Sequence, residues 1–323
     1  MLLDRLFRSH ATDHKRMSTK LTPRLPGGPT LLALGVFAGL GWPALADAAR
    51  PLMSATIFIF ILGTLLRVDR RELMVAIRSP MVSVVLPSTA MIACPVLIGL
   101  GTHLIGLDAE LAFAMVLSAA APPSSGTTAV ARMLGLNPTV PFAVTVLAMA
   151  IAPFSLPLVA AWFTGVALDP LTLAAGLAMM IGGAGAVALV LRRYQSARLS
   201  RHHLLLDRLV LTALLVFAVA TMAGVRQQIA EQPMTALACI GLAFGCNIGL
   251  QCLGAVTMPG TLPERLTAGL ILGNRNVGLV WSAIGAVSPR MALFFAATQF
   301  PIYILPRLID ILMRRAKRES VLP

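Results

Sequence analysis

Ten long apolar stretches, separated by short polar gaps, constrain the fold more than any other feature of the sequence. A helix needs about 20 apolar residues to cross the hydrocarbon core of a bilayer. Because 57% of the 323 residues are hydrophobic and only 12% are charged, no soluble fold could cover this apolar surface. We therefore predict an all-α membrane protein and exclude a soluble enzyme and a nucleic-acid-binding protein. The predicted spans are 30–46, 51–66, 81–105, 110–135, 139–165, 170–191, 206–224, 234–257, 264–286 and 289–312.

The positive charges support this span count. With the N-terminus in the cytoplasm, the inner segments carry 21 of the 26 Lys and Arg residues, and the outer segments carry Arg50, Arg226 and Arg290. Basic residues are retained on the cytoplasmic side of membranes. This predicts both termini in the cytoplasm. We separately expect the membrane to be the bacterial inner membrane. The first two spans are short and meet at Arg50-Pro51, so nine spans is the alternative count.

The predicted spans divide into two groups of five at residues 166–169. An odd number of spans in each half gives the second half the opposite polarity in the membrane. Two halves with opposite orientation form an inverted repeat, an arrangement that is common in transporters. The domain plan is a basic tail over 1–29, a transmembrane domain over 30–313 and a second basic tail over 314–323.

The fourth span is interrupted by two consecutive prolines, Pro122 and Pro123. They remove two backbone donors in mid-membrane, so the freed carbonyls need other partners. Nearby hydroxyls, water or a bound solute can supply them. The hydroxyls belong to Ser124, Ser125, Thr127 and Thr128. A plain proline kink, with hydroxyls that only satisfy the backbone, is the structural alternative.

The ninth span carries Asn274, Arg275 and Asn276 between Gly273 and Gly278. Three polar side chains at bilayer depth are costly unless they meet polar partners or water. Breaks in the fourth span of each half are a sequence pointer to a binding site at the membrane midplane. The N-termini of half-helices there would favour an anion.

These two stretches resemble the bile acid:sodium symporter family. That family has Ala-Pro-Gly-Gly-x-x-Ser-Asn in its fourth helix and Glu-x-Gly-x-x-Asn-x-Gly in its ninth. Here residues 121–128 read Ala-Pro-Pro-Ser-Ser-Gly-Thr-Thr, and residues 271–278 read Ile-Leu-Gly-Asn-Arg-Asn-Val-Gly. The resemblance implies ten transmembrane helices in two inverted five-helix repeats, with broken helices 4 and 9 crossing. It also implies a panel domain (spans 1, 2, 6 and 7), a core domain (spans 3–5 and 8–10) and a substrate cleft between them.

The resemblance also shows which sodium ligands this chain lacks. The family's Ser-Asn pair maps to Thr127 and Thr128, its fifth-helix hydroxyl pair maps to Pro141 and Thr145, and its ninth-helix Glu maps to Ile271. The Gln that follows this Glu maps to Arg275. Losing the carboxylate and gaining a guanidinium reverses the local electric field. We predict that sodium does not bind at these positions and that the chain holds no metal.

Arg275 is the central candidate, because it stays protonated and has no obvious acidic partner in the sequence. Three interpretations are open. The guanidinium could take the place that sodium has in the family and hold the crossing together. It could face the cleft and bind a substrate carboxylate through two hydrogen bonds. It could also face lipid or water without a specific role.

The predicted function is secondary transport of a small organic anion by alternating access, without sodium coupling and without a cofactor. The alternative is a non-transporting membrane receptor or scaffold with the same fold. We expect no enzyme, because no catalytic constellation lies at membrane depth. Besides the solute, the expected partner is membrane lipid, and the oligomeric state is open. The candidate substrate-binding residues are Arg275, Asn274, Asn276, Ser124, Ser125, Thr127, Thr128, Thr145 and Asn247.

Asn247 has a second explanation. It shares a helix face with Gln251, four residues further on. Such a pair could line the cleft or form a hydrogen bond between helices.

Overall fold

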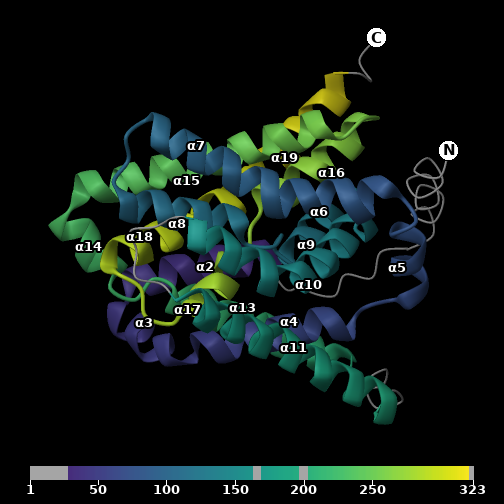
Figure 1. Ribbon diagram of the computed structural model, residues 1–323, viewed down its shortest axis with the longest axis horizontal. Coiled ribbons are helices and arrows are strands. Elements are labelled where there is room, and N and C mark those ends of the chain that lie inside the picture. Colours follow the sequence, from purple (N-terminus) through teal and green to yellow (C-terminus); the bar gives the residue numbers. More distant parts are fainter. Residues whose placement is uncertain (1–27, 163–168, 196–202, 320–323) are drawn as a thin grey trace.

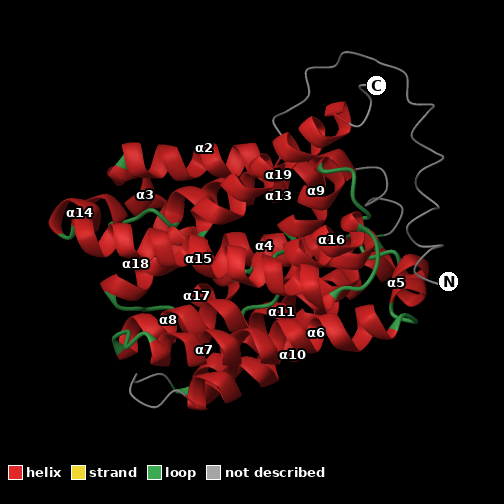
Figure 2. Cartoon of the chain, turned by 90° about the horizontal axis from the view of Figure 1, so that it is seen from above, coloured by secondary structure: helices red, strands yellow, loops and turns green. Residues whose placement is uncertain are grey.

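The computed structural model describes residues 28–162, 169–195 and 203–319, and these residues form helices joined by short loops, without a β-strand (Figures 1 and 2). Seven helical segments are long and apolar enough to cross a membrane. The expected class, an all-α integral membrane protein, is confirmed at this level. The seven segments are Pro43–Leu66, Met81–Leu104, Thr139–Trp162, Pro170–Tyr194, Leu204–Glu231, Pro233–Thr257 and Pro289–Ile311.

Several of these segments consist of more than one helix. The first joins α3 (Pro43–Ala49) to α4 (Met53–Leu66), and the second runs through π-helical turns and α6 (Leu86–Ser88) to α7 (Cys94–Leu104). The others are α10 (Thr139–Trp162), α11 (Pro170–Tyr194), α13 (His203–Ala220) with α14 (Val225–Glu231), α15 (Pro233–Thr257), and α18 (Pro289–Ala297) with α19 (Gln299–Glu319).

Three predicted spans correspond to shorter helices. The range 30–46 contains α2 (Gly28–Gly41). The range 110–135 contains α8 (Ala109–Ala120) and α9 (Gly126–Met133). The range 264–286 contains α16 (Leu262–Gly273) and α17 (Val277–Ile284). The last two interruptions fall at the residues where the sequence predicts broken helices.

The boundary predicted at Arg50-Pro51 is wrong, because the helix continues from Pro43 to Leu66. A single 3-10 turn, Arg50–Leu52, accommodates the proline within the helix. The chain breaks at Trp42 instead, where φ is −131° and ψ is 80°. The residue before a proline avoids the helical region, and Pro43 then begins the next helix at a position where proline is tolerated.

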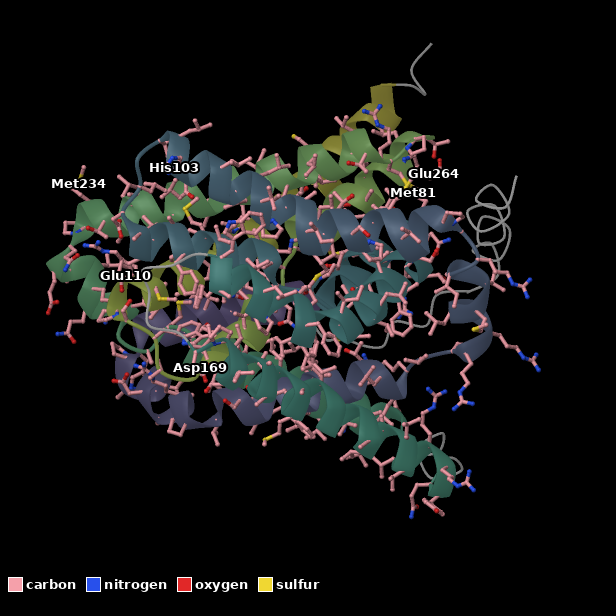
Figure 3. All side chains as sticks on the ribbon, viewed as in Figure 1. Met81, His103, Glu110, Asp169, Met234 and Glu264 are labelled. Carbon is pink, nitrogen blue, oxygen red and sulfur yellow. The ribbon has the colours of Figure 1, made fainter. Side chains whose placement is uncertain are left out.

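Apart from the breaks at 121–125 and 274–276, most described loops lie toward the two ends of an elongated helix bundle (Figure 1). His103, Glu110 and Met234 lie toward one end, whereas Met81 and Glu264 lie toward the other (Figure 3). This separation agrees with the charge-based assignment, which puts the first three next to outer segments and the last two next to inner segments.

Polar side chains cap the N-termini of several helices at these ends. Asp69 and Asp108 accept hydrogen bonds from first-turn N–H groups of α5 (Arg70–Ala76) and α8. At the start of α11, the Thr172 hydroxyl and backbone N–H groups donate to the Asp169 carboxylate, which lowers the pKa of Asp169. Caps of this kind satisfy N–H groups that have no acceptor within the helix.

Helices α15 and α16 approach each other closely along a line of glycines. A Cβ atom added to Gly254 would lie 2.8 Å from the Cα of Gly269, and one added to Gly269 would lie 2.8 Å from the carbonyl oxygen of Gln251. Small residues allow helix backbones to pack this closely in membranes. The contact fixes the position of α16 and therefore of the chain break that follows it.

Candidate functional site

The two interrupted helices meet at their breaks. Residues 121–125 lie between α8 and α9, and residues 274–276 lie between α16 and α17; together we call them the crossing. The N–H of Ser124 donates to the carbonyl of Asn274 (2.7 Å), and the N–H of Asn276 donates to the carbonyl of Pro122 (2.8 Å). The segments thus form a short antiparallel bridge centred on Pro123 and Arg275. Main-chain atoms link the two breaks inside the helix bundle.

Local sequence explains why both helices stop here. Pro122 and Pro123 carry no N–H, so they cannot continue the hydrogen bonding of α8. Ala121, which precedes them, is already extended, with a ψ of 143°. On the other segment, Asn274 is extended and Asn276 caps α17 by accepting a hydrogen bond from the N–H of Leu279 (3.3 Å).

Arg275 lies inside the protein at the crossing and is 4% exposed. Its Nη1 donates to the carbonyl of Ala121 (3.3 Å), while Nε and Nη2 have no partner among the described residues. Helices α8 and α16 both end beside the Arg275 guanidinium. Because helix C-termini carry partial negative charge, a guanidinium is well placed there. The arrangement is a fixed cation between two carbonyl-rich helix ends.

A cavity of about 580 Å³ opens from the crossing. Its inner end is polar, whereas its walls are mainly apolar side chains from α4, α13 and α19. Pockets with apolar walls and a few converging polar groups are typical of small-molecule sites. The inner end is lined by Ser124, Ser125, Thr127, Asn274, Arg275 and Asn276, and the walls include Ile57, Phe60, Val210, Leu214, Phe217 and Ile302.

Two helix N-termini also reach this cavity. Gly126 and Thr127 begin α9, and Val277 and Gly278 begin α17, and all four line the cavity. First-turn N–H groups carry partial positive charge; in α9 those of Gly126 and Thr127 donate to Ser124 Oγ (3.3 Å) and to the Ser124 carbonyl (2.9 Å), so it is the helix dipole that α9 contributes. Gly278 also lets α17 come close to α13, because a Cβ atom there would lie 2.7 Å from a ring carbon of Phe217. The inner end of the cavity is therefore suited to a negatively charged group.

Many polar atoms at the crossing and in the first turn of α9 have no hydrogen-bond partner in the described part of the chain. Such atoms are rare in protein interiors, and each one calls for water, a ligand or an ion. They include Ser125 Oγ, Thr127 Oγ1, Thr128 Oγ1, both side-chain amide atoms of Asn274, and Asn276 Nδ2.

The structure brings six of the nine predicted site residues together around the cavity: Ser124, Ser125, Thr127, Asn274, Arg275 and Asn276. The other three do not line it. The Thr128 and Thr145 hydroxyls are buried without a partner, and Thr145 is fully enclosed on α10. Asn247 lies behind the crossing, where its Nδ2 donates to the carbonyl of Gly273 (2.9 Å).

The Asn247 contact favours the helix-to-helix hydrogen bond among the two explanations drawn from the sequence. Its side chain satisfies the last carbonyl of α16, and Gln251 Nε2 donates to Asn247 Oδ1 (2.6 Å). Asn247 therefore positions the break in α16.

Replacing Asn247 with leucine should destabilise the protein, because the buried carbonyl of Gly273 loses its donor. We expect a loss of about 1–2 kcal/mol in the free energy of unfolding. Reversible unfolding in detergent measures this loss. Thr257→Val is the control, since the Thr257 hydroxyl bonds only within its own helix, to the carbonyl of Leu253 (2.7 Å). Equal stability of the two variants would contradict the assigned role.

The two positions at which the sequence resemblance predicts lost sodium ligands have no side-chain oxygen. Ile271 is fully enclosed within α16, and Pro141 is buried in α10. Among the described residues, no group of three or more His, Cys, Asp and Glu side chains could hold a metal ion. Absence of sodium binding stays a prediction.

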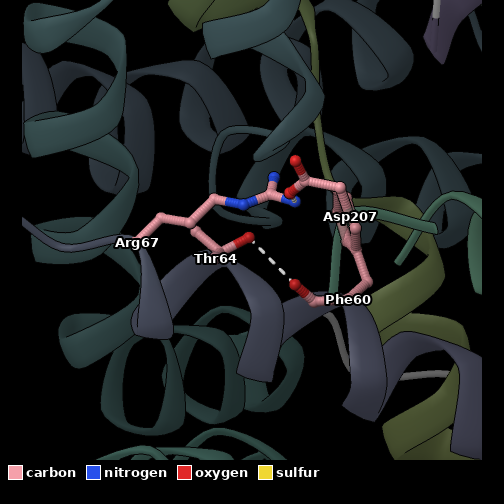
Figure 4. Close-up of polar contacts among 4 residues, drawn as sticks. All are labelled: Phe60, Thr64, Arg67 and Asp207. Atoms are coloured by element: carbon pink, nitrogen blue, oxygen red, sulfur yellow. Dashed lines mark hydrogen bonds and ion pairs between the residues drawn. The ribbon is translucent and has the colours of Figure 1, made fainter. Parts of the chain in front are cut away.

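Sequence reasoning missed three charged residues of the cavity: Arg67, Arg132 and Asp207. Arg67 follows α4 and Asp207 lies on α13, and their side chains form an ion pair at 2.5 Å (Figure 4). Beside them the Thr64 hydroxyl donates to the carbonyl of Phe60 (2.9 Å). These charges are separated by more than 60 residues along the chain and look like ordinary loop charges, so no local pattern brings them together.

No protein-family model matches the chain, and no curated protein matches it significantly in sequence.

Proposed function

We propose that this protein is a secondary transporter that moves small organic anions across the membrane by alternating access and without sodium. The observation that carries the proposal is the crossing: a buried guanidinium and two helix N-termini converge on the polar end of a cavity of about 580 Å³. A cavity at paired helix breaks is the arrangement expected of a transporter binding site. Its volume lies within the range typical of sites for small molecules.

The proposed architecture is that of the bile acid:sodium symporters, with ten spans in two inverted repeats. The seven long helical segments supply seven spans, and α2, α8–α9 and α16–α17 supply the other three. In this scheme α4 and α13 belong to the panel domain, whereas α9, α17 and α19 belong to the core domain. The cavity walls come from both groups of helices, which supports a cleft between two domains that move relative to each other.

In this proposal the N-termini of α9 and α17 bind the negative group of the solute, and Arg275 supplies a permanent positive charge. The guanidinium is tied to the carbonyl of Ala121, so it stays in place whether or not solute is bound. It thereby takes over the stabilising role that a cation has in the family. The mainly apolar walls accommodate the rest of the solute. Transport then needs no sodium for assembly of the site.

The first test is ligand binding by the purified protein. A panel of small carboxylates and sulfonates is added in sodium chloride or in choline chloride, and the thermal unfolding midpoint is measured. A ligand at about 100 times its Kd stabilises the folded state by about 2.7 kcal/mol. We expect at least one anion to raise the midpoint equally in both salts. A rise that requires sodium, or one produced by sodium alone, would contradict sodium independence.

Uptake into proteoliposomes then distinguishes a transporter from a receptor that binds the anion without moving it. The anion identified by binding is offered in radiolabelled form under both salts. We expect uptake that saturates and that is the same with and without sodium. Binding without any flux would contradict transport and would fit a receptor with this fold.

A further inference from the structure

The charged residues of the cavity occupy two separate levels. Arg275 is buried at the inner end, whereas Arg67, Arg132 and Asp207 are exposed at the other end, which we call the mouth. The paired side chains of Arg67 and Asp207 are 48% and 54% exposed. These four are the charged side chains among the described residues that line the cavity. A solute that reaches Arg275 from the mouth passes them.

Among the described residues that line the cavity, Asp207 is the single negative charge. It is paired with Arg67, whereas Arg132, at the end of α9, has no carboxylate partner in the part of the chain that the structure describes. The mouth therefore carries two guanidinium groups and one carboxylate, a net charge of +1. Without Asp207 the net charge would be +2. Low-dielectric walls focus the electric field within a cleft. A change of one unit of net charge at the mouth therefore has a large effect on the rate at which ions enter.

We propose that Asp207 is a specificity-determining residue that limits the entry of anions according to their charge. By neutralising Arg67 it keeps the mouth attractive to anions with one negative charge, while it lowers the attraction for those with two or more. The biological role of this charge selection rests on the proposed function, the transport of anions. A mouth with two unpaired guanidinium groups would be occupied by multivalent anions, because such groups bind phosphates and multiple carboxylates well. A repulsive element of this kind is a common source of specificity.

The experiment measures entry directly with thiol reagents of graded charge. The reporter is Ala129→Cys, because Ala129 is exposed, lines the cavity and lies on α9 one turn before Arg132. Methyl methanethiosulfonate is neutral, sulfonatoethyl methanethiosulfonate carries one negative charge, and Ellman's reagent carries two. Each reagent forms a mixed disulfide with the reporter thiolate and releases its leaving group. Peptide mass spectrometry follows residue 129 separately from the native cysteines.

For each reagent, the rate in Asp207→Asn is divided by the rate with Asp207 present, so that differences in reagent size cancel. At about 10 mM ionic strength the neutral reagent reports only the rise in the thiolate fraction of the reporter, and relative to it we expect about a fourfold increase for the monoanion and about a fifteenfold increase for the dianion. At about 1 M salt the increases should largely disappear, because screening then acts within about 3 Å. Equal changes for all three reagents, or no change for the anions, would overturn the proposal.

The double variant Arg67→Gln with Asp207→Asn separates charge from structure. It lacks the ion pair but keeps a net charge of +1 at the mouth, as in the unmodified protein. We expect its three rate ratios to return to within about twofold of unity, since net charge governs the field at the reporter. If the double variant behaves like Asp207→Asn alone, the ion pair acts through structure and the proposal is wrong. These measurements need no transport, so their outcome is independent of whether the chain moves anions.

Discussion

Replacing Arg275 with methionine is expected to reduce anion affinity by about a hundredfold and to abolish measurable uptake. Methionine keeps most of the length of the side chain and removes its charge. For an anion held about 6 Å from the guanidinium at an effective dielectric constant of about 20, the lost attraction is about 3 kcal/mol. That loss corresponds to about a hundredfold weaker binding. Binding of the anion identified by thermal unfolding, followed by uptake into proteoliposomes, measures the effect.

Two further variants control this result. Arg265→Met removes an exposed arginine that donates to the carbonyl of Ala255 on α15, outside the cavity, and uptake should persist. Arg275→Lys keeps the charge beside the ends of α8 and α16, so we expect part of the activity to remain. If Arg275→Met binds and transports the anion normally, the role assigned to the guanidinium is wrong.

Replacing Gly254 with alanine should destabilise the protein by about 3 kcal/mol. The added Cβ atom would lie 2.7 Å from the carbonyl carbon of Ala268 and 2.8 Å from the Cα of Gly269. These are backbone atoms of α16, so the helices must separate, and overpacking of this kind costs about 1–3 kcal/mol even where side chains can adjust. Unfolding in detergent, monitored by temperature or denaturant, measures the loss.

Gly249→Ala is the matched control for this substitution. Gly249 lies on the same helix, and a Cβ atom there would have no neighbour within 4 Å. Alanine is a better helix former than glycine by up to about 1 kcal/mol, so the control should be neutral or slightly stabilising. If both alanine variants are equally stable, the close approach of α15 and α16 is not what fixes the break at Gly273.

The sequence predicts both interruptions of the helices, because they depend on local chemistry. Pro122 and Pro123 cannot donate hydrogen bonds, and polar Asn274, Arg275 and Asn276 cannot face hydrocarbon, so each pattern identifies a break by itself. Residues near these breaks also form the inner end of the cavity. Six of the nine candidate residues lie there for this reason.

The contacts between distant segments could not be predicted in the same way. Asn247 meets the carbonyl of Gly273 only because glycines let α15 and α16 pack closely, and a spacing of four residues does not reveal that partner. The ion pair of Arg67 and Asp207 joins residues 140 positions apart. The wrong boundary at Arg50-Pro51 has another cause, since one 3-10 turn accommodates the proline and the helix continues beyond it.

The two main-chain hydrogen bonds of the crossing join N–H groups to carbonyls, and neither depends on a side chain. Mutations at Ser124, Ser125 and Asn274 should therefore leave these two bonds in place, whereas Arg275 also contributes a side-chain hydrogen bond to the carbonyl of Ala121. The polar lining of the cavity can in this way change by a few substitutions, without a new architecture having to evolve first.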